Sequence, residues 1–303
     1  MSTTIPHTSP RKVFLAGLAL AIVGAIFFSG KAIVAKLIYR YNVDAVTLLA
    51  LRMIFSMPFF AVAAIWKSRG QTPLSNGERV KIVILGILGY YLASFLDFLG
   101  LQYISAGLER LILFLTPSFV LLLSLFFLKK KISLPEWLAL GTAYLGTVLV
   151  FLHDVKLGGS NVVLGSALVL GAALSYAIYL MLSGEMVRRI NAMRLVGYLM
   201  CVASVICIAQ FFLVRPASML VQPMEVYGLS LVNAFFCTVL PVVMTMVAVE
   251  RIGAGTTSQA GMIGPVSTLF LGALILDEPI TGIQLAGTAL VLIGIYLLSK
   301  KKT

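Results

Sequence analysis

The chain alternates between long apolar stretches and short groups of polar, charged or turn-forming residues. A helix of about 20 apolar residues is long enough to cross the hydrocarbon core of a bilayer. Spanning segments must be helical, because an open sheet would leave backbone groups unpaired in lipid. The pattern therefore predicts an all-α integral membrane protein with ten transmembrane helices, at residues 13–36, 44–66, 80–101, 104–128, 135–153, 162–183, 193–214, 226–249, 254–276 and 281–299.

The same unit of five apolar stretches occurs twice along the chain. An offset of 148 residues connects matching residues of the two halves: Gly17 with Gly165, Ala25 with Ala173, Ser56 with Ser204, Gly107 with Gly255, Pro117 with Pro265 and Gly146 with Gly294. Five is an odd number of crossings, so the second unit must enter the membrane from the opposite side, and such inverted repeats are typical of transporters. We predict a first repeat at 1–153, a polar, glycine-rich linker at 154–161 and a second repeat at 162–303, within one membrane domain.

Composition excludes a soluble fold. The chain is 60% hydrophobic and 11% charged, with a mean hydropathy of +1.04, and so few charges cannot cover a water-exposed surface. Ten spans of about 20 residues use about two thirds of the chain. Only short connections remain, so the membrane domain is expected to be the whole protein.

The net charge of +12 is distributed in a way that indicates membrane topology. Lysines and arginines gather in alternate connections, at residues 11–12, 67–69, 79–81, 129–131, 188–194 and 300–302. The positive-inside rule makes these connections cytoplasmic, and both termini with them. The stretch Lys129 to Lys131 in the first repeat is equivalent to the stretch with Asp277 and Glu278 in the second. This change of sign agrees with the two stretches lying on opposite sides of the membrane. The positive charge is therefore not interpreted as a nucleic-acid-binding surface, and the expected partner is the lipid bilayer.

No pattern in the chain indicates an enzyme, a metal site or a cofactor. The three cysteines lie inside predicted spans without a CxxC spacing, and the two histidines are isolated, so we interpret the cysteines as packing residues. Phosphate-binding, dinucleotide-binding, metalloprotease and Ser/His/Asp patterns do not occur. No protein partner is evident either. Function is expected to depend on conformational change around a pocket for a small molecule.

Two prolines are candidates for gating. Pro117 and Pro265 lie near the middle of the fourth and ninth spans, at equivalent positions of the repeats. Each removes one backbone hydrogen bond and frees a carbonyl about one turn earlier. Discontinuous helices at matching places are a pointer to a substrate site near the midplane. We predict gating hinges at these prolines, with helix packing as the alternative.

Polar and aromatic residues within the spans are candidates for a substrate cavity. On the third span, Tyr90, Ser94 and Asp97 share one face at spacings of four and seven residues. A tyrosine in mid-span is expected to face the protein interior or a wet cavity, because a lipid-facing hydroxyl would be unpaired; interior packing remains the alternative for each. The predicted cavity residues are Phe28, Ser29, Tyr90, Ser94, Thr116, Tyr176, Tyr179, Thr238 and Gln259.

Ionisable residues at membrane depth are costly, and they therefore carry information. The third and fourth spans form a hairpin, so that Asp97 and Arg110 are expected at nearly equal depth, with Glu109 beside them. The first interpretation is a structural salt bridge between Asp97 and Arg110. The alternative is charge coupling, in which Asp97 or Glu109 exchanges a proton or contacts a substrate amino group. Arg52 is expected to snorkel or to pair with a carboxylate.

Two stretches resemble a known family. The stretch at 99–107 (LGLQYISAG), followed by Thr116-Pro117-Ser118-Phe119, resembles the third and fourth helices of the EamA-type branch of the drug/metabolite transporter superfamily, and 276–280 (LDEPI) resembles the end of each half in that family. The resemblance implies ten helices, a central cavity and export of small metabolites from the bacterial cytoplasm across the inner membrane.

The expected function is a secondary transporter that exports a broad range of amino acids or related small metabolites by alternating access. This expectation includes aromatic amino acids, since the chain is similar to bacterial exporters of that kind. Three alternatives remain open. They are an exporter of drugs or organic cations, which would use Glu109 or Asp97, a passive channel, and a membrane-embedded enzyme.

Overall fold

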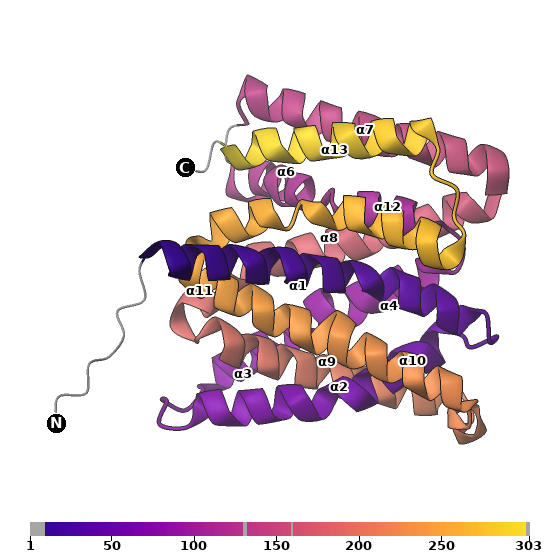
Figure 1. Cartoon of the computed structure of the whole chain (residues 1–303). Helices are drawn as coiled ribbons and strands as arrows, with labels where there is room; N and C mark the ends of the chain where they lie inside the picture. Colours follow the sequence, from indigo (N-terminus) through magenta and orange to yellow (C-terminus); the bar gives the residue numbers. More distant parts are fainter. Residues whose placement is uncertain (1–9, 130–131, 159, 301–303) are drawn as a thin grey trace.

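The computed structural model describes residues 10–129, 132–158 and 160–300, and over these residues it is built of helices without a strand. Figure 1 shows the helices side by side in one bundle. Nine helical segments of this part are long and apolar enough to cross a membrane, and the shorter apolar helix Gly282–Leu298 makes a tenth. The all-α class and the ten-helix pattern are confirmed.

The elements follow the order expected for two five-helix units. The first half contains α1 (Pro10–Tyr39), α2 (Ala45–Ser68), α3 (Asn76–Gly86), η1 (Ile87–Leu92), α4 (Ala93–Leu101), α5 (Ala106–Leu113), α6 (Thr116–Leu128) and α7 (Leu134–Gly158). The second half contains α8 (Ser160–Arg189), α9 (Ala192–Val214), η2 (Ala217–Leu220), α10 (Met224–Ala234), η3 (Phe235–Val239), α11 (Leu240–Ala260), α12 (Ile263–Leu276) and α13 (Gly282–Lys300).

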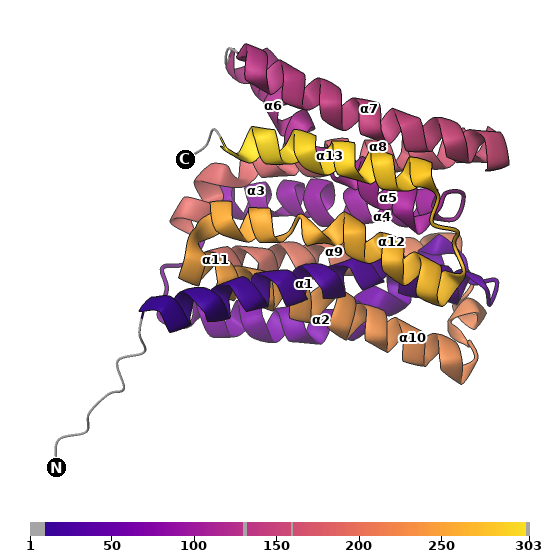
Figure 2. The ribbon, with the colours of Figure 1, turned by 45° about the horizontal axis from the view of Figure 1, so that its top comes forward.

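The two ends of the bundle can be told apart by the chain direction. Helix α1 begins and α13 ends at the same end of the bundle, at the left of Figures 1 and 2. We call this the proximal end and the other the distal end. Helix α7 finishes at the distal end, so α8 runs back in the direction opposite to α1. The second repeat is therefore inverted relative to the first.

The contacts between helices follow a two-fold pattern. Helix α2 packs on its equivalent α9 and α7 on its equivalent α13, while the pair α1–α11 is matched by the pair α8–α4. The match extends to single atoms. A Cβ atom on Gly17 would lie 2.6 Å from Ile252 Cγ2, and one on Gly165 would lie 2.8 Å from Ile104 Cγ2. Both pairs of positions differ by 148, so the same contact is made once by each repeat.

Glycine is required where two of these helices cross. A Cβ atom on Gly100 of α4 would lie 2.6 Å from the carbonyl oxygen of Gly165 on α8. The α7–α13 pair has the same kind of crossing, because a Cβ atom on Gly146 would lie 2.5 Å from the carbonyl oxygen of Gly287. Small residues let membrane helices approach backbone to backbone, and both crossings connect the two repeats.

The fourth and ninth spans are each broken near the middle. The first break separates α5 from α6 at residues 114–115, and Pro117 lies in the first turn of α6. The second break separates α11 from α12 at residues 261–262, and Pro265 lies in the first turn of α12. The discontinuity inferred from the two prolines is thus present in both repeats, while their role as hinges stays a prediction.

A single residue joins the eighth and ninth spans. Helix α11 contains Gly253 with φ 78° and ψ 159°, a conformation outside the helical region. Only glycine adopts this backbone conformation without strain. The chain therefore reverses at Gly253 and starts the ninth span immediately.

Two π-helical turns occur at equivalent positions. Turn η1 covers Ile87–Leu92 in the third span, and η3 covers Phe235–Val239 in the eighth. Their first residues are again 148 positions apart. π-turns are rare and occur often at functional sites. The sequence pattern did not predict them.

The predicted linker at 154–161 is largely helical. Helix α7 continues to Gly158, and α8 begins at Ser160, while Gly159 lies outside the described residues. The extension of α7 is held by Asp154, whose Oδ2 accepts a hydrogen bond of 2.8 Å from the Ser105 hydroxyl that precedes α5. This tertiary contact stabilises the helical conformation of a stretch whose polar residues had predicted a linker.

The loop before α2 carries a capping carboxylate. Asp44 accepts hydrogen bonds from the Thr47 backbone N–H at 2.9 Å and from Arg215 Nε at 2.8 Å. Partial burial acts to raise the pKa of Asp44, but these two hydrogen bonds outweigh it and hold the pKa below its ordinary value. The pair connects the distal ends of the two repeats.

Candidate functional site

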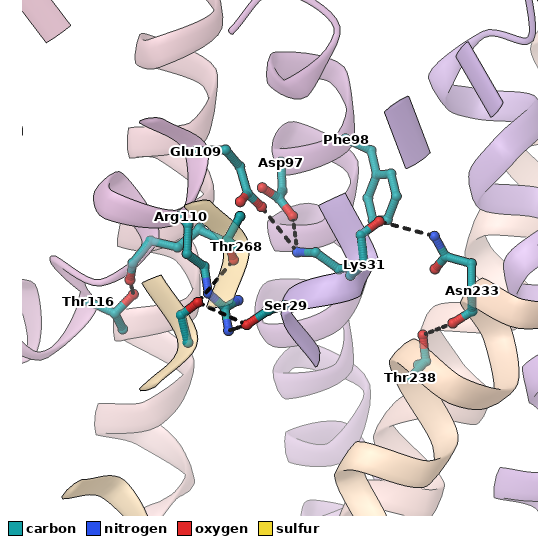
Figure 3. A network of polar contacts seen from close by, with 12 residues as sticks. Ser29, Lys31, Asp97, Phe98, Glu109, Arg110, Thr116, Asn233, Thr238 and Thr268 are labelled. Carbon is teal, nitrogen blue, oxygen red and sulfur yellow. Dashed lines mark hydrogen bonds and ion pairs between the residues drawn. The ribbon is translucent and has the colours of Figure 1, made fainter. Parts of the chain in front are cut away.

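Four ionisable side chains meet inside the membrane-spanning part of the bundle, nearer the distal end. They are Lys31 on α1, Asp97 on α4, and Glu109 and Arg110 on α5, each 5% exposed or less. Figure 3 shows them converging from these three helices. We call them the buried charge cluster. Ionisable groups within membrane spans are expensive to bury and mark functional sites by default.

Lys31 is the centre of the cluster. Its Nζ lies 2.5 Å from Asp97 Oδ2 and 3.4 Å from Glu109 Oε1 (Figure 3). The ammonium also lies over the rings of Phe28 and Phe98, at 5.4 and 5.5 Å from their centroids. Within the described residues, Asp97 Oδ1 and both Glu109 oxygens accept no hydrogen bond. One lysine therefore serves two carboxylates that retain acceptor capacity.

The predicted salt bridge between Asp97 and Arg110 is wrong. Asp97 pairs with Lys31, and Arg110 points away from it. The reason is the helical turn of about 100° between successive residues, which directs Glu109 toward Lys31 and the neighbouring Arg110 toward α12. Lys31 was not among the candidate residues inferred from the sequence. A lysine about two turns inside a span was the available signal.

Arg110 connects the cluster to the broken ninth span. Its Nη2 donates to the Ser29 hydroxyl at 3.3 Å. That hydroxyl lies within hydrogen-bond distance of two carbonyls, those of Ala25 at 2.8 Å and Gly264 at 3.0 Å. The guanidinium carbon lies 4.9 Å from the ring centroid of Phe28 and 5.5 Å from that of Phe114. A planar cation between aromatic faces is stabilised by the ring quadrupoles. Arg110 Nε has no hydrogen-bond partner among the described residues.

A second polar group surrounds the π-turn η3. Arg52 Nε donates to Thr238 Oγ1 at 2.9 Å, and its guanidinium lies 5.0 Å from the Phe98 ring centroid. Thr238 donates to the Asn233 carbonyl, and the Asn233 amide donates to the Lys31 carbonyl at 3.2 Å. Arg52 is 5% exposed. Its predicted snorkelling or carboxylate partner is thus replaced by a hydroxyl of the other repeat.

The predicted tyrosines form an aromatic cluster around the other π-turn. The rings of Tyr90 and Tyr179 are 5.4 Å apart, and those of Tyr176 and Tyr179 are 5.3 Å apart. A Cβ atom on Gly89 would lie 2.4 Å from Tyr179 Cγ, so the absence of a side chain there admits the ring. Ser175 donates to the carbonyl of Leu88 inside η1.

The remaining predicted residues differ in burial and partners. Thr116 is buried and donates to the Leu113 carbonyl at 2.7 Å across the first break. Ser94 is half-buried on α4, whereas Gln259 and Pro117 are exposed and Pro265 is buried.

Two surface cavities lie elsewhere in the described part of the chain. One, of about 570 Å³, is lined by Leu37, Arg40, Tyr41, Glu225, Gly228 and Leu229. The other, of about 500 Å³, is lined by Ser68, Gln71, Pro73, Leu74, Arg79, Ile82, Val83, Arg194 and Tyr198. Neither contains a residue of the predicted substrate cavity. Within the described residues, no group of three or more His, Cys, Asp or Glu side chains could hold a metal ion.

Comparison with known proteins supports the duplicated architecture. The model of the EamA-like transporter family matches twice, at residues 15–152 and 163–300. The uncharacterized transporter YcbK of Bacillus subtilis is 29% identical, over 90% of this chain and 89% of its own length. An uncharacterized transporter of Archaeoglobus fulgidus is 27% identical, over 87% of this chain and 92% of its own length. A crystal structure that is 16% identical has a similar fold, with a TM-score of 0.64 over 95% of this chain and 99% of the solved one.

Proposed function

Since the chain belongs to the EamA-like transporter family, we propose that it exports amino acids or related small metabolites by alternating access in a bacterial inner membrane. In this proposal the proximal end of the bundle, with both termini, is cytoplasmic, because the positively charged connections gather there. The substrate range is expected to include amino acids with aromatic or other large apolar side chains.

The main observation behind the proposal is the position of the buried charge cluster. It lies between the repeats, and Arg110 reaches the first turn of α12, directly after the break in the ninth span. Discontinuous helices around an intramembrane charged site are the usual construction of secondary transporters. Charges of both signs suit a zwitterion, which carries an ammonium and a carboxylate.

The aromatic cluster supports a substrate with an apolar part. Tyr90 and Asp97 lie in one span, and seven residues of helix separate them by about 10 Å along the axis. An amino acid with its charged end at the buried charge cluster can direct its side chain toward Tyr90, Tyr176 and Tyr179. Tyrosine rings combine apolar contact area with a polar hydroxyl.

Alternating access requires contacts between the repeats that can open at one end at a time. At the distal end, Arg40 donates to the Leu276 carbonyl and Lys36 pairs with Glu278 at 3.7 Å. At the proximal end, Arg194 Nε donates to the Ser68 hydroxyl at 3.1 Å. These contacts all connect the first repeat with the second. In the proposed cycle, the distal contacts and the proximal contacts are broken alternately.

An exporter of organic cations is the second candidate. The unpaired oxygens of Glu109 and Asp97 favour it, because a buried carboxylate can bind a cationic ligand. Lys31 opposes it, because its ammonium already lies between the two carboxylates. Inhibition of amino-acid counterflow by a competing organic cation, such as a quaternary ammonium, would favour this candidate.

Counterflow in proteoliposomes tests the proposal. Purified protein is reconstituted, the vesicles are loaded with one unlabelled amino acid at a time, and entry of the labelled form is followed with and without a pH gradient. A carrier gives saturable counterflow for at least one amino acid, whereas a channel gives flux that does not saturate. No flux above protein-free liposomes for any amino acid would refute the proposed function.

A further inference from the structure

Among the described residues, no carboxylate lies within ion-pair distance of the Arg110 guanidinium. Arg110 is 5% exposed, and the one side-chain hydrogen bond that it makes among the described residues goes to the neutral Ser29 hydroxyl. Glu109, its neighbour in sequence, pairs with Lys31 instead. A guanidinium carries five N–H donors and cannot lose its proton in a protein. Most of its donor capacity is therefore unused.

The wider surroundings also have an excess of positive charge. Lys31 and Arg52 lie over the same ring, that of Phe98, so Arg52 belongs to the same electrostatic neighbourhood as the cluster. Three cations, Lys31, Arg52 and Arg110, then face two carboxylates, Asp97 and Glu109. An isolated buried charge is strongly unfavourable. A single negative charge supplied by a ligand would balance the group.

The guanidinium of Arg110, including its unpartnered Nε, lies against the start of a helix. A Cβ atom on Gly264, the second residue of α12, would lie 2.8 Å from Arg110 Nη2. The guanidinium therefore rests on the backbone of the first turn of α12, a helix of 14 residues. Helix N-termini carry partial positive charge, although here the Gly264 N–H already donates to the Gly261 carbonyl at 2.9 Å. The dipole and the guanidinium favour an anion at the same place.

We infer that Arg110, at the first turn of α12, is the receptor for an anionic group of the substrate, namely a carboxylate. This inference rests on the proposed function, because it assigns one end of the transported molecule to one side chain. Phe28 and Phe114 fix the plane of the guanidinium, which then presents its N–H fork to a carboxylate. The substrate class is small carboxylates with an apolar body. Organic cations are excluded from it.

Three related compounds separate the ligand charges. Phenylalanine carries both charges, 3-phenylpropionate only the carboxylate, and phenethylamine only the ammonium. Binding is measured as ligand-induced thermal stabilisation of the purified full-length protein, and transport as counterflow in proteoliposomes. For the wild-type protein, we expect responses to phenylalanine and 3-phenylpropionate and none to phenethylamine.

Two substitutions of Arg110 and one control complete the design. Arg110→Gln removes the charge, and Arg110→Lys keeps the charge but loses the planar fork. The control is Arg69→Gln, which removes the same charge from an exposed arginine at the end of α2, away from the buried charge cluster. Arg110→Gln should weaken carboxylate binding by about 10- to 100-fold, the usual range for a charged hydrogen bond. The carboxylate affinity of Arg110→Lys should lie between those of wild type and Arg110→Gln. The affinity of the control should be within about threefold of wild type.

The outcomes are distinguishable. Equal responses to phenylalanine and phenethylamine, or carboxylate affinity unchanged in both folded Arg110 variants, would overturn the anion site while the export proposal stands. A response to 3-phenylpropionate alone that is lost in Arg110→Gln would support the anion site and count against amino-acid export. No response of wild type to any of the three compounds counts against both. The wild-type comparison is informative even if the glutamine variant does not fold.

Discussion

The Lys31 ammonium is shared by two buried carboxylates, so its removal should cost more than the removal of either carboxylate. In Lys31→Met, Asp97 and Glu109 lose their common counter-ion. In Asp97→Asn, Lys31 keeps Glu109 at 3.4 Å, and in Glu109→Gln it keeps Asp97 at 2.5 Å. Because Coulomb attraction falls with distance, the expected order of destabilisation is Lys31→Met, then Asp97→Asn, then Glu109→Gln.

The magnitudes follow from burial. Breaking a buried ion pair by removing one partner costs about 3–5 kcal/mol, and Lys31→Met should reach this range. Neutralising one carboxylate leaves an ion pair in place, so Asp97→Asn and Glu109→Gln should cost about 1–3 kcal/mol each. The double variant Lys31→Met/Asp97→Asn should cost less than the sum of the single variants, with a coupling of at least about 1 kcal/mol.

The free energy of unfolding can be measured by titrating the purified protein with sodium dodecyl sulfate in mixed micelles. The matched control is Lys36→Met on the same helix, where Lys36 pairs with Glu278 at 3.7 Å and its side chain is 23% exposed. An exposed pair contributes about 0–1 kcal/mol. If Lys31→Met destabilises no more than Lys36→Met or Glu109→Gln, Lys31 is not the shared counter-ion.

Three further predictions concern the helix contacts. Gly100→Ala should destabilise the α4–α8 crossing by about 1–3 kcal/mol, whereas Gly141→Ala, with nothing within 4 Å of its Cβ, should be neutral or stabilising by up to about 1 kcal/mol in the same titration. Asp44→Asn should lower the free energy of unfolding by about 0.5–1 kcal/mol at pH 7. Since the native pKa of Asp44 is lowered, the difference between wild type and variant should shrink as the pH falls below about 4. A difference that does not change with pH would contradict a stabilising role of the Asp44 carboxylate. Pro265→Ala should slow counterflow without loss of expression, and more than Pro117→Ala, because Pro265 is buried and Pro117 exposed; unchanged kinetics in both would remove the hinge hypothesis.

The sequence predicted the features that depend on periodicity and spacing. The ten spans follow from the length of the apolar stretches, and the inverted arrangement from an odd number of spans per repeat. The breaks in the fourth and ninth spans followed from Pro117 and Pro265. Proline lacks a backbone N–H, and this effect does not depend on how the helix packs against its neighbours.

The sequence could not predict features that depend on how the helices are rotated against one another. The depth of Lys31 can be counted along its span, but its partners depend on which face of α1 meets α4 and α5. Arg110 was placed at the correct depth and given the wrong partner for the same reason. The continuation of α7 past Asp154 depends on a hydrogen bond from Ser105, which is distant in sequence.

The π-turn η1, directly before α4, contains one residue more than an α-helical turn would need. If η1 tightened to an α-helix, the following residues would advance by one position, which corresponds to a rotation of about 100° and a shift of about 1.5 Å. Asp97 would then turn away from Lys31, while α3, the part of the span before η1, stayed in place. The extra residue in η3 precedes Thr245, the uncharged equivalent of Asp97. The same rearrangement of a π-turn would thus be possible in both repeats. It would move a charged side chain, Asp97, in the first repeat and an uncharged one, Thr245, in the second.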